Sequence, residues 1–420
     1  FILFLLSANT VWYTGYTIPL IGLSESLCNM SIYLDQHLKD EIDVIEVNGR
    51  YLFAGPPGMS VLLAIPLCLF TLFTSNKLLL ASIVTSFIGV LATYISYKLS
   101  QLYVSHKYSL LSSIIVALAG PLWIYSTHVF PQIGLSLSLG VALYAFIIIV
   151  RRARISLYWP LLAGLSTGFS IILDPSAIVY LIIISFIALS CLLEKIRELS
   201  LDYFVLAKYI VSYIIGFLPL AMILLVYNKL ATGNMFLLPE QYLLAERGIG
   251  LHGFTTPVYL GLYIQLLDLR KGLLLLYPTM FTALLFLPEF LVKAKVNMFE
   301  KAILLTAISC PLLIYSLWYD PDGGLSHGPR FIVPLTIFLA PLLAYVVERY
   351  YRLRKVIALF SSYCIIENVI VTTTTPYPCA YEDLGPLENQ FITCSIPHLL
   401  KGTRSSYLYN LIKYTINEPY

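Results

Sequence analysis

The residues best suited to chemistry are polar side chains that interrupt an apolar chain, and the first of them is Glu25. Residues 20–58 carry six acidic side chains, which are Glu25, Asp35, Asp40, Glu41, Asp43 and Glu46. Glu25 follows closely on the apolar run that opens the chain, so we expect a fixed backbone there, and a rigidly placed carboxylate can serve as a general base. The later acids form a hydrophilic run and are expected to face solvent. The alternative for Glu25 is a solvated loop residue without a catalytic role.

A second polar segment runs from Trp318 to Arg330 and reads WYDPDGGLSHGPR. Clustered glycines let a backbone approach a ligand closely. The guanidinium of Arg330 opens the next apolar run, where it can pair bidentately with a phosphate; the alternative is an arginine that extends to lipid headgroups. His327 is a candidate binding residue in the same loop, with a surface histidine as the alternative, and no second histidine or cysteine stands at metal-ligand spacing around it.

A third candidate is the pair of adjacent cations Arg270 and Lys271, which stands at the start of another apolar run. Such a pair can bind a phosphate or an anionic lipid headgroup. Packing within the preceding loop is the alternative.

The elements that position these residues must be membrane helices. Of the 420 residues, 59% are hydrophobic and only 12% are charged, and the mean hydropathy is +0.82. An ordinary globular chain has about 25% charged residues. Apolar runs of spanning length recur along the chain, which predicts an all-α polytopic membrane protein. The net charge of +3 is too small to indicate a nucleic-acid partner.

Lysine and arginine clusters set the expected orientation, because they favour the cytoplasmic side. With all four clusters inside (Arg151–Arg154, Lys195–Arg197, Lys293–Lys295 and Arg349–Lys355), the chain makes about eleven crossings. We expect these crossings near residues 1–19, 77–100, 108–127, 131–150, 157–173, 175–193, 204–226, 272–291, 301–318, 331–348 and 355–371. The apolar run 59–75 is short, and counting it as a crossing would place the Arg151–Arg154 cluster outside. It is therefore expected to form an interfacial or re-entrant helix. A wrong assignment of one cluster is the alternative.

This threading predicts a transmembrane domain over residues 1–375 and an extracytoplasmic tail over 376–420. The outer loops are 20–58, 227–270 and 319–330. The opening run has no basic start and no small-residue cleavage site, so we expect a retained helix rather than a signal peptide.

Cysteine positions agree with this sidedness. Cys68, Cys191, Cys310 and Cys364 lie in apolar runs, where a free thiol is a small hydrophobe. Cys379 and Cys394 lie in the tail and are a candidate disulfide of an oxidising compartment, with two free thiols as the alternative. Asn29 begins an Asn-Met-Ser glycosylation pattern on the same side.

Motifs of several other classes are missing from the sequence. It has no Walker loop, no GxGxxG before a helix, no serine nucleophile elbow and no His/Cys metal array. No charged residue with an evident partner lies in the middle of an expected span, which argues against an ion-coupled transporter.

The polar segments follow one another in a characteristic order. They are Glu25, Asn48-Gly49-Arg50-Tyr51, Gly55-Pro56-Pro57-Gly58, Tyr125-Ser126-Thr127, Tyr227-Asn228, Gly233, Gln241-Tyr242, Arg270-Lys271-Gly272-Leu273, Tyr277-Pro278, Trp318, Gly323-Gly324, Ser326 and Gly328-Pro329-Arg330. This ordered set, which extends over most of the chain, resembles the membrane glycosyltransferases of the GT-C superfamily. The nearer likeness is to prokaryotic relatives of protein O-mannosyltransferases and of the lipid A aminoarabinose transferase.

The resemblance implies transfer of a sugar from a polyprenyl-phosphate donor to a lipid, glycan or protein acceptor outside the cytoplasm, usually with inversion. An acidic residue of the first outer loop would deprotonate or orient the acceptor, a role that falls to Glu25. Arg330 and Arg270, with Lys271 behind it, would face the phosphate. Tyr51 and the Pro56-Pro57 corner would shape the loop. No cofactor is implied with certainty, although a divalent metal is one option.

A second hypothesis is a non-catalytic membrane subunit that uses the same scaffold to anchor or assemble a larger complex with protein partners. It predicts that replacing Glu25 changes nothing, whereas the transferase hypothesis predicts loss of transfer. The many tyrosines and few charges are weakly typical of an archaeal source.

Overall fold

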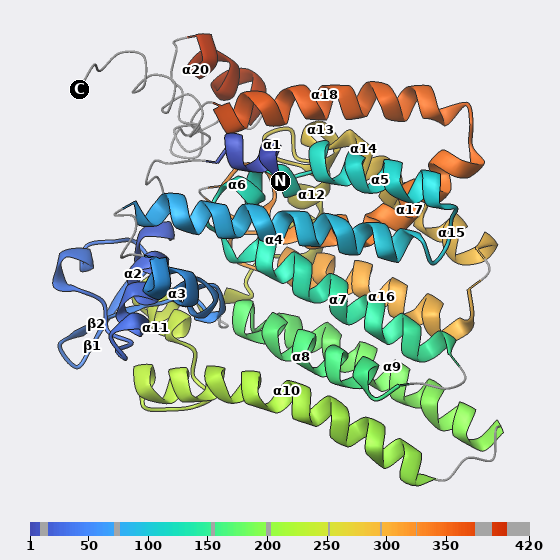
Figure 1. Cartoon of the computed structure of the whole chain (residues 1–420). Coiled ribbons are helices and arrows are strands. Elements are labelled where there is room, and N and C mark those ends of the chain that lie inside the picture. The colour runs from blue at the N-terminus through green and yellow to red at the C-terminus, as the bar shows by residue number, and fades with distance from the viewer. Residues whose placement is uncertain are drawn as a thin grey trace.

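The computed structural model describes residues 1–8, 16–70, 76–152, 156–198, 203–250, 253–294, 296–324, 326–373 and 389–400. Long apolar helices run side by side through most of the molecule (Figure 1). Within the described residues, six are long and apolar enough to cross a membrane: α4 (Lys77–Ser100), α7 (Pro131–Arg151), α9 (Ala177–Glu198), α10 (Tyr203–Thr232), α16 (Met298–Ser316) and α18 (Leu353–Thr373). The predicted all-α membrane architecture is confirmed, while the number of crossings stays a prediction.

Shorter helices complete the bundle. α8 (Tyr158–Leu173) packs between α7 and α10, and α17 (Leu335–Arg349) packs against α4 and α5 (His106–Leu118). Gly164 allows α8 and α10 to touch, because a Cβ atom there would overlap the carbonyl oxygen of Tyr213. Small residues at such crossings are typical of membrane helix pairs.

Three expected spans are not single helices. The expected span 108–127 is divided into α5 and α6 (Leu122–Thr127), with Gly120 and Pro121 at the break. The expected span 272–291 is divided into α13 (Leu273–Leu276), α14 (Pro278–Leu285) and α15 (Leu287–Lys293), because Pro278 and Pro288 each begin a new helix.

The expected first span, 1–19, is also wrong in its bounds. Helix α1 (Ile2–Leu6) stops early, and α2 (Thr17–Cys28) carries the chain well past Pro19. Glu25 therefore stands on a helix rather than in a loop.

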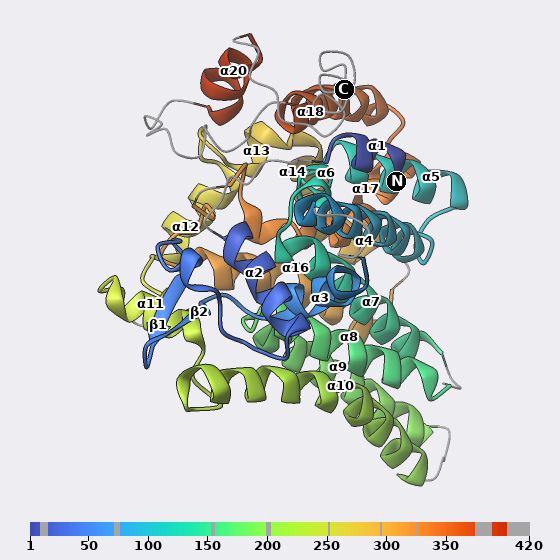
Figure 2. The same ribbon diagram turned by 60° about the vertical axis from the view of Figure 1, so that its left-hand side comes forward.

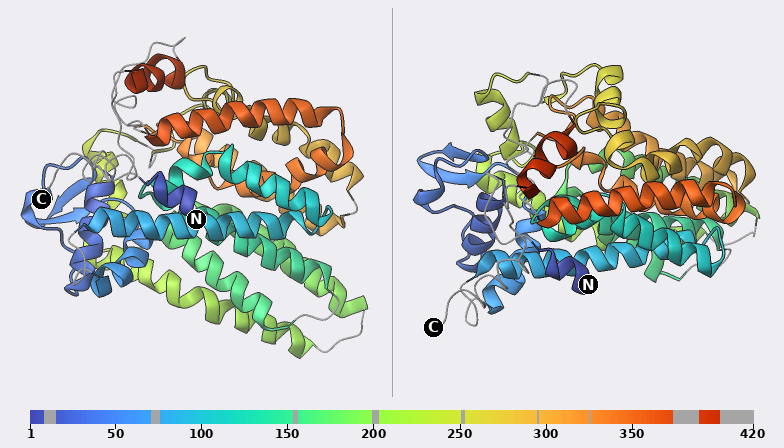
Figure 3. Two further views of the ribbon diagram at one scale, coloured as in Figure 1. Left: turned by 45° about the horizontal axis from the view of Figure 1, so that its top comes forward. Right: turned by 90° about the horizontal axis from the view of Figure 1, so that it is seen from above.

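The basic clusters lie at one end of the bundle, as the sequence predicts. The end of α7, the end of α9, the start of α16 and the turn between α17 and α18 lie together on the right of Figure 1. We call this the cationic end. The opposite end carries a small two-stranded sheet and is called the hairpin end (Figures 1 and 3).

The hairpin end is built from the segment that follows α2. Strands β1 (Val44–Val47) and β2 (Arg50–Phe53) pair antiparallel, with Val44 opposite Phe53. Their two-residue turn, Asn48-Gly49, has φ values of 54° and 74°, the left-handed values that an Asn-Gly hairpin turn requires. Short helices η1 (Gln36–Leu38), α11 (Pro239–Glu246) and α12 (Val258–Leu266) lie at the same end (Figure 2).

Helix α3 (Gly58–Phe70) follows the hairpin and packs against α2 (Figure 2). Its 13 residues span about 20 Å, less than the roughly 30 Å of a hydrocarbon core. A disulfide joins Cys28, at the end of α2, to Cys68 on α3. Cys68 is thus bonded rather than a free thiol, which corrects the prediction, whereas Cys191, Cys310 and Cys364 are free.

Helix η3 (Arg330–Ile332) comes directly before α17. After α18, η4 (Gln390–Ser395) and α20 (Ile396–Leu400) pack beside that helix. Cys394 of η4 is disulfide-bonded, and Cys379 lies outside the described residues. Most of the predicted tail, 376–420, is likewise outside them.

Candidate functional site

A cavity of about 320 Å³ lies at the hairpin end, among the first residues of α11, the ends of α8 and α16, and η3. Its wall combines carboxylates, guanidinium groups and aromatic rings. The charged members are Asp43, Asp174, Glu240, Arg247 and Arg330, and the aromatic members are Tyr16, Phe254, Tyr315, Trp318, Tyr319 and Phe331. Aromatic rings beside charged groups suit a ligand that has both apolar faces and polar edges.

Arg330 is the predicted residue that the structure places in this cavity. Its guanidinium carbon lies 5.0 Å from the ring centre of Phe331 and 5.9 Å from those of Tyr16 and Phe130. Its Nε atom is buried without a hydrogen-bond partner, and no carboxylate in the described part of the chain forms an ion pair with it. The aromatic rings therefore hold the cation while its donors stay available for an anion.

The loop before Arg330 passes close over that side chain. Gly323 has a φ of 86°, and a Cβ atom there would lie 2.5 Å from Cγ of Arg330. Glycine is required at this position both for the backbone conformation and for the space.

Two carboxylates face the same cavity with different surroundings. Asp43 immediately precedes β1, and its Oδ1 atom lies 3.9 Å from the guanidinium of Arg247. Burial raises the pKa of Asp43, opposed by Arg330 and Arg247. Glu240 stands in the first turn of α11, and no hydrogen bond to its side chain is found among the described residues. Burial, reinforced by Asp174 and Asp43, raises the pKa of Glu240 to about 7.

Asp174, the third carboxylate, is fully engaged by its neighbours. Its Oδ1 atom accepts hydrogen bonds from the backbone N–H and hydroxyl of Ser176 at 3.0 and 2.6 Å, and its Oδ2 atom accepts one from Tyr315. The ring of Tyr315 stacks on Phe331 at 5.0 Å. Asp174 thus fixes the wall against which Arg330 rests.

An apolar groove of about 320 Å³ lies beside the cavity, lined by α2, α3 and α10 side chains such as Leu27, Val61, Met222, Val226 and Leu230. A narrow space of about 10 Å³, which we call the neck, lies between groove and cavity. The neck shares Pro56 and Glu240 with the cavity, and Pro57 and Tyr227 with the groove. The hydroxyl of Tyr227 donates a hydrogen bond of 2.8 Å to the carbonyl of Phe53, which fixes the neck to the hairpin.

The structure does not bring Glu25 to Arg330. The carboxylate of Glu25 pairs with the ammonium of Lys77 at the start of α4, and Glu25 is not part of the cavity wall. Because α2 continues to Cys28, the side chain of Glu25 is directed sideways from a helix instead of into the cavity.

Tyr51 also lies outside the cavity wall. It pairs with Glu46 across the hairpin, and its carbonyl accepts a hydrogen bond of 2.9 Å from the backbone of Leu34. The adjoining Pro56 does line the cavity. Of the expected loop-shaping residues, Pro56 thus lies in the cavity wall and Tyr51 lies outside it.

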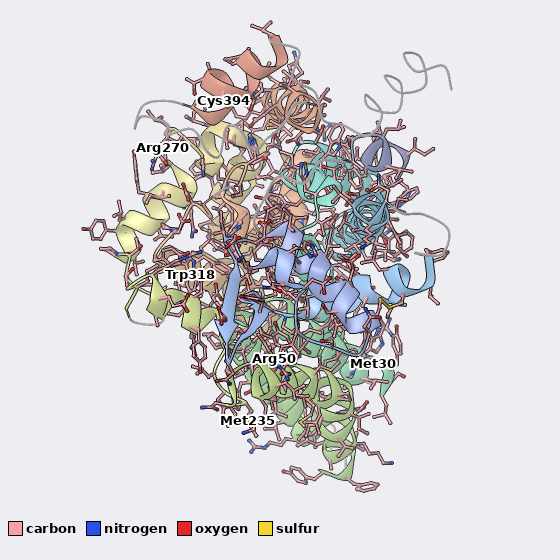
Figure 4. The ribbon with its side chains drawn as sticks, turned by 90° about the vertical axis from the view of Figure 1, so that its left-hand side faces the viewer. Met30, Arg50, Met235, Arg270, Trp318 and Cys394 are labelled. Atoms are coloured by element: carbon pink, nitrogen blue, oxygen red, sulfur yellow. A yellow bond between two sulfur atoms is a disulfide. The ribbon has the colours of Figure 1, made fainter. Side chains whose placement is uncertain are left out.

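The other predicted cations are engaged elsewhere. Arg270 pairs at 3.0 Å with the buried carboxylate of Asp268. Figure 4, a view onto the hairpin end, shows Trp318 between Arg270 and Arg50. Lys271 donates a hydrogen bond of 2.6 Å to the carbonyl of Gly324 and lies 3.2 Å from Asp322. Neither side chain lines the cavity.

His327 is buried rather than at the surface. Its Nε2 atom lies 3.1 Å from Oε1 of Glu367, a residue of α18, and both side chains are almost fully inaccessible. Burial, together with Lys271 and His128, lowers the pKa of His327 to about 3. Glu367 lies near the end of the expected span 355–371, and its partner is a histidine of the loop 319–330 rather than a charged residue of another span.

Sequence reasoning missed Asp43, Glu240 and Arg247. Asp43 was assigned to solvent, although it immediately precedes an Asn-Gly hairpin that could have indicated an ordered loop. Glu240 follows Pro239 at a helix start, a position that fixes its backbone. Nothing local in the sequence indicates that Asp43 and Glu240 line the same cavity.

Among the described residues, no group of three or more His, Cys, Asp or Glu side chains could hold a metal ion. Asn29 is exposed at the end of α2, so its glycosylation stays a prediction.

No family model and no curated protein matches the sequence. Solved structures do resemble the fold. ArnT, the lipid A aminoarabinose transferase from Cupriavidus metallidurans, matches in its apo state with a TM-score of 0.57 and 13% identity, over 90% of this chain and 64% of that one. The same enzyme bound to undecaprenyl phosphate matches with a TM-score of 0.57 and 11% identity, over 88% and 68%.

The archaeal oligosaccharyltransferase AglB from Archaeoglobus fulgidus, in complex with an inhibitory peptide and a dolichol-phosphate, has a TM-score of 0.51 and 14% identity. That match covers 100% of this chain and 57% of AglB. The chain thus spans about two thirds of ArnT and rather more than half of AglB. At these identities the likeness shows the fold alone: the chain has the fold of ArnT and AglB, which are members of the GT-C superfamily.

Proposed function

We propose that the chain transfers a sugar from a polyprenyl-phosphate carrier to an acceptor, and that the cavity at the hairpin end is the active site. One observation carries this proposal: a guanidinium with unused donors and two carboxylates face one cavity that borders an apolar groove. Such a combination suits a ligand with a phosphate in the middle, a sugar on one side and a hydrocarbon chain on the other.

Arg330 is the residue that we assign to the carrier phosphate. A guanidinium on aromatic rings is less hydrated than an ammonium and can donate two parallel hydrogen bonds to phosphate oxygens. Undecaprenyl phosphate bound to ArnT and dolichol-phosphate bound to AglB support a ligand of this class.

The isoprenoid chain would leave the cavity through the neck, past Pro57 and Tyr227, into the groove between α2, α3 and α10. The groove is lined by apolar side chains and suits a hydrocarbon. The neck is narrow, so we expect the side chains around it to move apart when the carrier binds.

Asp43 takes the role that the resemblance assigned to Glu25, since it is the carboxylate of the first hairpin-end loop that faces the cavity. In an inverting transfer, ionised Asp43 accepts the proton of the acceptor hydroxyl as its oxygen bonds to the anomeric carbon. The bond from that carbon to the phosphate oxygen breaks, and its electron pair stays on the phosphate. Protonated Glu240, at the border of cavity and neck, donates a hydrogen bond to the departing phosphate as its charge increases.

We place the reaction on the extracytoplasmic face. The basic clusters gather at the other end of the bundle, as expected of a cytoplasmic side, and the Cys28–Cys68 disulfide between α2 and α3 suits an oxidising compartment. We assign the transferase to residues 1–375 and treat 376–420 as an attached tail.

The test is a transfer assay with the purified chain in lipid vesicles. Polyprenyl phosphates carrying a hexose or an aminopentose are supplied, and release of polyprenyl phosphate is measured with candidate acceptors. We expect release by the wild type and loss in Asp43→Asn, with Glu348→Gln, a change at the cationic end, as the control. Absence of release with every donor, while the chain stays folded, would favour the non-catalytic scaffold.

A further inference from the structure

The loop between Trp318 and Arg330 is attached to the bundle through a buried carboxyl group. Glu367 stands on α18, an apolar helix of spanning length, and its side chain is 0% exposed. An ionisable side chain inside such a helix is costly and calls for a reason. The described contact is the 3.1 Å hydrogen bond to Nε2 of His327, while Nδ1 of His327 and Oε2 of Glu367 are buried without partners.

Further contacts hold the same loop. The hydroxyl of Tyr125, on α6, donates a hydrogen bond of 3.2 Å to the carbonyl of His327. Lys271, which lies in the segment before α13, donates a hydrogen bond of 2.6 Å to the carbonyl of Gly324. The loop is therefore fixed from α6, α18 and the segment before α13, and its start is fixed by the hydrogen bond of 2.7 Å from the backbone N–H of Tyr319 to the carbonyl of Gly253.

Arg330 follows His327 by only three residues and lies beneath Gly323 of the same loop. A displacement of the loop must therefore move the guanidinium. Productive contacts in binding sites tolerate displacements of only about 0.5 Å.

We propose that the His327–Glu367 pair, supported by Tyr125, is a positioning device that holds Arg330 at its place in the cavity. Its consequence for phosphate binding rests on the proposed function. It gives His327 a role different from ligand binding, and it explains why α18 carries a carboxyl group between apolar side chains.

The charge state of the pair agrees with this role. Burial and the nearby Lys271 and His128 keep His327 neutral, since they lower its pKa to about 3. Because the imidazole is neutral, one proton between Nε2 of His327 and Oε1 of Glu367 is enough to form their hydrogen bond. The hydroxyl of Tyr125 contacts the His327 backbone, and Tyr277, Tyr363 and Cys364 face Glu367.

The first test is hydrogen–deuterium exchange of the full chain in detergent micelles. Glu367→Leu removes the hydrogen bond, Glu367→Gln keeps one, and Glu348→Gln is a control glutamate at the cationic end. Tyr125→Phe is a milder change that removes one hydroxyl, with Tyr180→Phe as its matched control, because the buried hydroxyl of Tyr180 has no partner. We expect exchange in residues 319–330 to accelerate about ten-fold or more in Glu367→Leu, less in Tyr125→Phe, and not in the other three variants. Unchanged exchange in both Glu367→Leu and Tyr125→Phe would overturn the proposal.

The second test asks whether the pair acts through Arg330. Binding of undecaprenyl phosphate is measured for Tyr125→Phe and Glu367→Leu, each with Arg330 present and with Arg330→Gln. If the pair acts by positioning Arg330, both variants should weaken binding when Arg330 is present and should cause no further weakening in the Arg330→Gln chain. Equal losses of affinity in both chains would contradict this role. If Arg330→Gln itself leaves binding unchanged, the proposed function fails, and the exchange result still decides whether the pair holds the loop.

Discussion

The guanidinium of Arg330 rests against the ring of its neighbour Phe331 at 5.0 Å and has no anionic partner among the described residues. Lys271, a cation close by in the fold, is already engaged at 3.2 Å from Asp322. A cation held by aromatic rings beside a cavity is ready to receive an anion, because no ion pair has to be broken first.

Replacement of Arg330 should therefore weaken binding of the carrier phosphate. Hydrogen bonds to charged groups contribute about 1.5–3 kcal/mol each, so Arg330→Gln is expected to lower the affinity for undecaprenyl phosphate roughly ten- to hundred-fold. Titration in detergent with a fluorescent polyprenyl phosphate measures this. Arg270→Gln, which removes the ion pair with Asp268 outside the cavity wall, should have little effect on this affinity. An equal loss in Arg270→Gln would restore the sequence-based assignment of Arg270 and place the phosphate outside the cavity.

Asp43 and Glu25 make competing predictions for the base. Removal of a general base typically costs about 10²–10⁴-fold in rate. We expect a kcat loss of this size for Asp43→Asn with a smaller change in donor KM, and nearly unchanged kinetics for Glu25→Gln. The reverse pattern would show that the first-loop base is Glu25 and that its position on α2 changes during the reaction.

The pH profile of transfer tests Glu240. Its pKa of about 7 means that the carboxyl is protonated below that pH and ionised above it. The ionised form repels the phosphate, so kcat/KM for the donor should fall as pH rises through about 7, whereas ionisation of Asp43 sets the acidic limb. Burial is the main cause of this raised pKa; Asp174 and Asp43 raise it further, and Arg330 and Arg247 oppose the shift.

Glu240→Gln should remove the alkaline fall, because glutamine stays neutral. Glu246→Gln, at the exposed end of the same helix, should leave the profile as in the wild type. An alkaline limb that persists in Glu240→Gln would assign it to another group.

The Cys28–Cys68 disulfide should stabilise the hairpin end. It closes a segment with a sequence separation of 40 that contains Asp43 and Pro56, and disulfides typically contribute about 2–4 kcal/mol. We expect a lower Tm and slower transfer in a double Cys28→Ser, Cys68→Ser variant, with Cys310→Ala as the control. Mass spectrometry after alkylation without reductant should find Cys310 modified and Cys28 and Cys68 unmodified. Alkylation of the latter two would contradict the bond.

The architecture follows from the sequence because the bilayer constrains it strongly. Apolar length and the positions of Arg151, Lys195, Lys293 and Arg349 were enough to predict the helical bundle and the common end of the basic clusters. The order of the polar motifs was enough to predict the GT-C fold.

The position of the general base could not be predicted from the sequence, and the reason is local to the first helices. The first apolar run is expected to end near Pro19. In the structure Pro19 occupies the first turn of α2, where proline is tolerated because that N–H needs no helical partner. Glu25 was thereby moved from an expected loop onto a helix.

The cavity itself depends on contacts between distant segments. Asp43, Glu240 and Arg330 come from three separate segments of the chain, and each has other charged residues nearby in the sequence. Arg270, Lys271 and His327 satisfy the usual expectations for ligand binding, but Asp268, Asp322 and Glu367 already engage them. Only the packing of the helices decides which charged side chains remain unpaired and can bind a ligand.

A structure of the chain with undecaprenyl phosphate in a lipid nanodisc tests the central claim most directly. The account predicts phosphate density within hydrogen-bond distance of Arg330, beside Glu240, and a tail that passes Pro57 and Tyr227 into the groove along α10. Phosphate bound at Arg270 or elsewhere, with the cavity at Arg330 left without it, would contradict the account.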